Sequence, residues 1–144
     1  MIAAIIWSLI MLIALLVFIG LYVDALKRAS ERYREQYRES IADAAEEIDT
    51  YYDTKVDYDM HYSMLISNMG AARSFIFLLE ENNDNMNEKQ KAINELHYCL
   101  VKYPEQMKNK LEDVSKALKD IYDNLDKGYD EVREVVDSVD KMGK

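Results

Sequence analysis

The fold is decided by the stretch IAAIIWSLIMLIALLVFIGLYV, residues 2–23, which contains no charged side chain. A helix of this length extends about 33 Å at about 1.5 Å per residue, enough to cross a bilayer core of about 30 Å. Buried helices of soluble domains rarely run this long without a polar stripe. A cleaved signal peptide has basic residues before a shorter apolar run, and this segment lacks them. We therefore expect a transmembrane helix over residues 1–23.

The flanking charges predict the orientation of this helix. No Lys or Arg precedes it, whereas five bases follow within about 15 residues: Lys27, Arg28, Arg32, Arg34 and Arg38. Basic flanks stay preferentially in the cytoplasm, and acidic residues contribute little to this preference. We expect a single-pass membrane protein with its N-terminus outside and its C-terminal domain in the cytoplasm.

The composition beyond the apolar segment limits the fold and the partners. The 144 residues include 18 Lys and Arg against 27 Asp and Glu, and the excess of acids lies after residue 40. Such acidity disfavours nucleic-acid binding. One Pro and four Gly leave few turns, which argues against an all-β fold. The single Cys99 excludes an internal disulfide and a multi-cysteine metal site.

Helical periodicity continues past the membrane segment. Apolar residues follow one another at intervals of three or four from Leu26 to Tyr51, which predicts a juxtamembrane helical rod over 24–50. Residues 50–59 are poor helix formers and suggest a bend. Helix is expected again over 60–81 and 86–102, and a second membrane span over 62–79 is disfavoured by Arg73.

A heptad pattern marks the C-terminal third. Tyr103-Pro104 predicts a helix start, because proline is favoured at the first helical position. Apolar residues then recur every seven positions up to Met142, with Gly128 as the one interruption. We expect one long C-terminal heptad helix that packs on at least one partner helix.

Together these patterns predict an all-α protein. An N-terminal transmembrane helix (1–23) would continue as a juxtamembrane rod (24–50) into an acidic helical bundle (51–144). The bundle is expected to be antiparallel, with three or four helices.

Two groups of residues are possible sites. Asp57, Asp59 and His61 have ligand types that suit a divalent metal, but acidic clusters are common in so acidic a chain. We therefore expect no metal site, no cofactor and no catalytic residues. The tyrosines and the heptad series suit helix–helix contact, either in the core or with a partner. The residues chosen as an interaction surface are Tyr33, Tyr37, Leu111, Leu118, Ile121, Leu125 and Val132.

The function expected from these features is that of a membrane-anchored, non-catalytic scaffold or adaptor. Its partners would be the lipid bilayer, through residues 2–23, and a second copy or another helical protein. Two alternatives stay open. One is a membrane-tethered bundle that senses a metal or small ligand, and the other is a small membrane toxin, immunity or phage-lysis protein.

Overall fold

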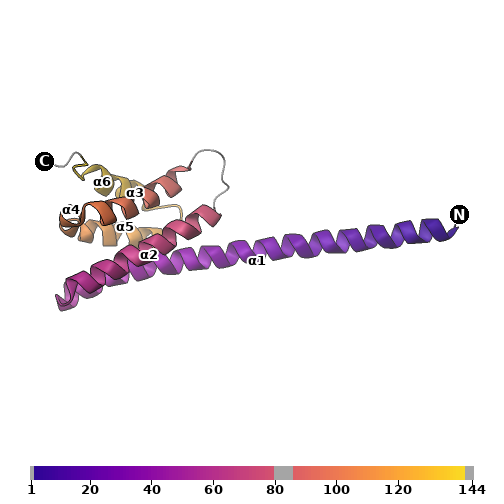
Figure 1. Ribbon diagram of the computed structural model, residues 1–144, viewed down its shortest axis with the longest axis horizontal. Helices are drawn as coiled ribbons and strands as arrows, with labels where there is room; N and C mark the ends of the chain where they lie inside the picture. Colours follow the sequence, from indigo (N-terminus) through magenta and orange to yellow (C-terminus); the bar gives the residue numbers. More distant parts are fainter. Residues whose placement is uncertain (1, 80–85, 142–144) are drawn as a thin grey trace. The chain divides into compact units, whose positions relative to one another are not determined.

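The computed structural model describes residues 2–79 and 86–141, and all regular secondary structure in these two ranges is α-helical (Figure 1). The predicted all-α class is confirmed. The chain divides into two compact units, residues 1–32 and 33–144. The described helices are α1 (Ile2–Thr54), α2 (Tyr58–Leu79), α3 (Glu88–Lys102), α4 (Pro104–Lys108), α5 (Leu111–Asp123) and α6 (Tyr129–Asp137).

The first unit contains the apolar part of α1. Among the described residues this is the one helix long and apolar enough to cross a membrane, with a mean hydropathy of 2.9 in its most apolar part. None of that part is buried within the protein, and Trp7 and Phe18 are each 69% exposed. The predicted membrane-spanning segment is therefore a helix whose apolar side chains have no protein cover.

The second unit, called the helical unit below, is built on a hairpin of α1 and α2. The rings of Tyr33 and Phe75 stack, with centroids 6.4 Å apart, and Tyr51 contacts Tyr58 edge-on at 5.0 Å. These two pairs show that residues 33–54 of α1 run antiparallel to α2 (Figure 1). Tyr37, Ile41, Ala44 and Ile48 bury one stripe of α1 in the core, as the helical periodicity predicts.

The hairpin turns at residues 55–57. Lys55 and Asp57 both have a φ of 53°, in the left-handed region that ends a helix for steric reasons. The bend expected within 50–59 thus exists, and it is confined to three residues.

Local contacts and residue types set where α3 and α4 begin. The side chain of Asn87 accepts a hydrogen bond from the backbone of Gln90, and Gln90 returns one to Asn87, which makes a capping box at the start of α3. Pro104 is the first residue of α4. In both cases a short-range pattern sets the helix boundary.

The expected long C-terminal heptad helix is wrong. Residues 104–137 form three helices, and α5 and α6 pack against each other. Gly128 has a φ of 83° and caps α6 in a left-handed conformation that no helix can continue through. Eight apolar heptad positions are nevertheless buried, because the short helices present apolar stripes to one core. These positions are Met107, Leu111, Val114, Leu118, Ile121, Val132, Val135 and Val139. Leu125 is partly buried, and Met142 lies outside the described residues.

The boundary of the helical unit also differs from the expected one at residue 50. Residues 33–50 do not form a separate rod, because their apolar stripe is part of the same core as the later helices. The juxtamembrane stretch outside that core is correspondingly shorter, ending at Arg32.

Candidate functional site

Aromatic residues gather where α1 meets α2. The ring of Tyr58 lies between those of Tyr51 and Tyr62, with centroid distances of 5.0 and 5.3 Å. The ammonium group of Lys108 lies 4.4 Å from the centroid of the Tyr58 ring, a cation–π distance. The hydroxyl of Tyr62 donates to the backbone carbonyl of Leu100 at 2.8 Å, which ties α2 to α3.

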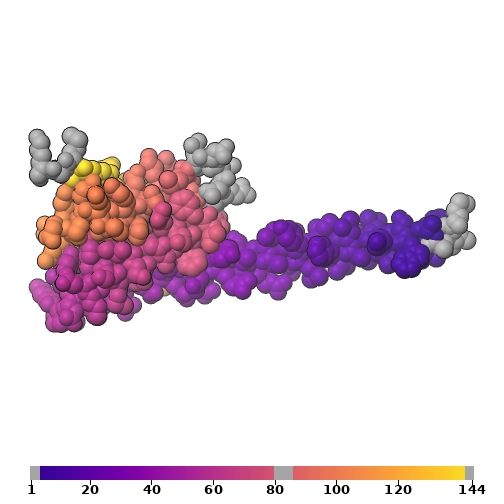
Figure 2. Space-filling view, in the orientation of Figure 1, coloured from indigo at the N-terminus to yellow at the C-terminus, as the bar shows by residue number. Residues whose placement is uncertain are grey.

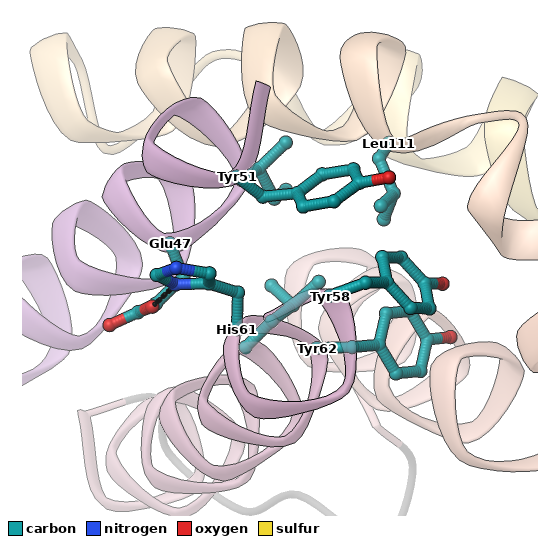
Figure 3. A pocket seen from close by; sticks show the side chains of 8 residues that line it. Glu47, Tyr51, Tyr58, His61, Tyr62 and Leu111 are labelled. Atoms are coloured by element: carbon teal, nitrogen blue, oxygen red, sulfur yellow. Dashed lines mark hydrogen bonds and ion pairs between the residues drawn. The ribbon is translucent and has the colours of Figure 1, made fainter. Parts of the chain in front are cut away.

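An ion-pairing contact lies beside this aromatic cluster. Nδ1 of His61 is 2.6 Å from Oε2 of Glu47, and the two side chains are only 13% and 16% exposed. The pair joins α2 to α1 across the hairpin (Figure 3). A carboxylate that fixes an imidazole is one part of a general-base arrangement. The hydroxyls of Tyr58 and Tyr62 point away from the imidazole, so the pair and the phenols do not converge on one point.

These side chains surround a very small cavity of about 10 Å³. That is about the smallest space that holds one water molecule, and it is too small for an organic ligand. The hydroxyl of Tyr58 is buried and has no hydrogen-bond partner among the described residues. Burial raises the pKa of Tyr58 to about 12 and raises that of Tyr62 as well. Both phenols are thus neutral near pH 7.

The three metal candidates do not converge. His61 faces Glu47, whereas Asp57 lies in the exposed turn and Asp59 is exposed on α2. The part of the chain that the structure describes contains no group of three or more His, Cys, Asp or Glu residues placed to hold a metal ion. Asp57 and His61 are four residues apart and would share one face of a continuous helix, but Asp57 precedes α2 and its φ of 53° is not helical.

The residues predicted as an interaction surface lie mostly inside this chain's own core. Tyr37, Leu111, Leu118, Ile121 and Val132 are buried, and Leu125 packs partly buried against them. Tyr37 also shares a 2.9 Å hydrogen bond with Tyr129. Tyr33 is the exception, at 36% exposed. Most of these predicted interaction residues therefore belong to the core of this chain, so a surface for docking a partner would consist of other residues.

Sequence reasoning missed Glu47 as the partner of His61. The position of the bend could have identified Glu47. If the chain reverses near residue 54, residue 47 lies opposite 61, residue 51 opposite 58, and residue 33 opposite 75. Each of these pairs is in contact in the structure. The poor helix formers predicted a bend somewhere within residues 50–59. The register between α1 and α2 depends on the residue at which the bend is centred, which they did not specify.

No family model, curated protein or solved structure matches the chain.

Proposed function

We propose that this protein is a single-pass, membrane-anchored helical adaptor. Residues 2–23 lie in the bilayer with the N-terminus outside, and the helical unit acts in the cytoplasm by contact with other helices, without catalysis. One observation carries the proposal: the apolar first part of α1 has no protein cover at all. Burial of each such side chain in lipid is worth about 1.5–3 kcal/mol, so water is a poor environment for this helix.

The residues that follow the segment support the orientation. Five bases lie between Lys27 and Arg38, directly after the segment. Bases at this place favour the cytoplasmic side and are attracted to anionic lipid at about 1 kcal/mol each. We also infer that the helical unit is an antiparallel bundle, which the antiparallel pairing of α1 with α2 supports.

Extraction of membranes with alkaline carbonate tests the anchor. The wild-type chain should stay in the membrane pellet. The double variant Leu12→Arg/Leu16→Arg places two charges at the centre of the segment, where each costs about 2.5–3.5 kcal/mol, and should move to the soluble fraction.

Leu26→Arg is the matched control, because Leu26 is 52% exposed and lies outside the apolar segment. It should stay in the pellet. Extraction of the wild-type chain by carbonate, or retention of the double variant in the pellet, would contradict the proposed anchor.

A further inference from the structure

The outer face of α2 carries a stripe of uncharged residues along the length of the helix. Figure 2 shows α2, in magenta to rose, lying along the surface of the helical unit. Met60, Met64 and Leu78 are 51%, 44% and 57% exposed. Ser67 and Ser74 are also exposed, and Ala71 is partly so. These residues, called the α2 stripe below, are Met60, Met64, Ser67, Ala71, Ser74 and Leu78.

The α2 stripe is less polar than its serines suggest. The hydroxyl of Ser74 donates to the carbonyl of Gly70 at 3.0 Å, and that of neighbouring Ser63 donates to Asp59 at 2.7 Å. Hydroxyls that donate to their own helix backbone need no other acceptor for their proton. The acidic or basic residues of α2 are Asp59, Arg73 and His61; none belongs to the stripe, and His61 faces Glu47.

The outer faces of α5 and α6 are charged, whereas α3 exposes Tyr98 and Val101 among charged residues. The exposed residues of α6 are all acidic: Asp130, Glu131, Glu134 and Asp137. Those of α5 are Glu112, Asp113, Lys116, Lys119, Tyr122 and Asp123. Two copies of a chain with net charge −9 repel each other. Along the α2 stripe they could approach over the full length of a helix without placing like charges together.

The spacing of the residues in the α2 stripe indicates that its partner is another helix. Successive members are separated by 4, 3, 4, 3 and 4 residues. This is the 3.5-residue repeat with which one helix packs along another at a small crossing angle. Small residues in the middle, Ser67, Ala71 and Ser74, allow a close approach, and the longer Met60, Met64 and Leu78 fill the space towards the ends.

We propose that the α2 stripe is a self-association surface, on which α2 of a second copy of this chain packs in parallel. This inference rests on the proposed membrane anchor. A helix about 33 Å long and about 10 Å wide presents on the order of 400–500 Å² to its partner. The total of about 1,000 Å² is the lower limit for a specific interface. Confinement of both chains to one membrane raises their effective concentration, which makes so small an interface sufficient.

The hairpin geometry selects the parallel arrangement. Each chain enters the helical unit at Tyr33, and the Tyr33 ring lies against Phe75 near the end of α2. Parallel packing of two α2 helices therefore puts both entry points at the same end, where one membrane can hold both anchors. Antiparallel packing would put the entry points at opposite ends.

Cysteine cross-linking of full-length chains in native membranes tests the inference. The wild-type chain should give no cross-linked band, because its single cysteine, Cys99, is 0% exposed. Under mild oxidation, Ser74→Cys should form a band at about twice the 16.8 kDa monomer mass. Ser138→Cys is the matched control, because Ser138 is an exposed serine off α2 whose hydroxyl also donates to its own backbone. It should stay monomeric.

A charge added to the α2 stripe provides a second readout. Ala71→Glu in the Ser74→Cys background should reduce the cross-linked fraction at least about tenfold, because a parallel pair would bury two facing carboxylates.

The inference would be overturned by absence of a Ser74→Cys dimer, by equal cross-linking of Ser138→Cys, or by cross-linking only when Met64→Cys chains are mixed with Ser74→Cys chains, because residue 64 faces residue 74 in antiparallel packing. A Ser74→Cys band of another mass would show a different protein as the occupant and would also overturn it. Membrane recovery measured in the same samples separates these failures from failure of the anchor.

Discussion

Gly128 lies at the break between α5 and α6, and its replacement by alanine tests whether that break exists. In the structure its φ is 83°, which costs an alanine about 1–2 kcal/mol. An added Cβ would also lie 2.6 Å from the carbonyl oxygen of Ala117 and 2.9 Å from the backbone nitrogen of Ile121. Both atoms are backbone of α5 and cannot turn aside, so overpacking adds about 1–3 kcal/mol. We expect Gly128→Ala to lower the free energy of unfolding by about 2–5 kcal/mol.

Thermal unfolding of the full-length chain in detergent, followed by circular dichroism, measures this effect. A loss of this size should lower Tm by about 10 °C or more for a unit of this length. In a continuous heptad helix the same substitution would stabilise by about 1 kcal/mol, because alanine is the better helix former. Gly70→Ala is the control: it is in α2, and its Cβ would lie 3.4 Å from Nε2 of His97. The control should leave Tm unchanged or slightly raised. An unchanged or raised Tm for Gly128→Ala would refute the break between α5 and α6.

Three further outcomes are expected from the α1–α2 junction. Tyr62→Phe removes a buried 2.8 Å hydrogen bond and should cost about 1–2 kcal/mol in urea unfolding, whereas Tyr33→Phe, half exposed, should cost nothing measurable. Burial raises the pKa of Tyr58 and of Tyr62 above the ordinary value of 10.0 in the folded state. The free energy of unfolding should therefore be constant up to about pH 10 and fall as the pH rises towards 12. A spectrophotometric titration in which all tyrosines ionise together near pH 10 would exclude this. His61→Ala leaves the carboxylate of Glu47 without its partner and should lower the free energy of unfolding by about 1–2 kcal/mol, measured by thermal unfolding near pH 7.

Local patterns predicted the elements that depend on local physics. The uncharged run over residues 2–23 marks the apolar helix, and the start signal at Pro104 is exact. The bend expected within 50–59 lies at 55–57. The burial of the heptad positions was also predictable, because an apolar side chain at a regular spacing is buried whichever helix carries it.

The partners of those buried residues could not be predicted in the same way. A seven-residue repeat of apolar residues is compatible with one long helix that packs on a partner. It is equally compatible with two short helices that share a core, and the left-handed conformation of Gly128 shows that α5 and α6 are of the second kind. His61 shows the same limit. Asp57, four residues before it, would share its face in a continuous helix, whereas the contact of His61 is with Glu47, which the hairpin brings from another helix.

The side on which the helical unit resides tests the central claim most directly. Two reporters fused in turn after Lys144 provide the measurement: a fluorescent protein that matures only in the cytoplasm, and a phosphatase that is active only outside it. A membrane-anchored adaptor oriented by its basic flank predicts fluorescence without phosphatase activity, with the fusions recovered in the membrane fraction. Phosphatase activity without fluorescence, or recovery of either fusion in the soluble fraction, would contradict the account.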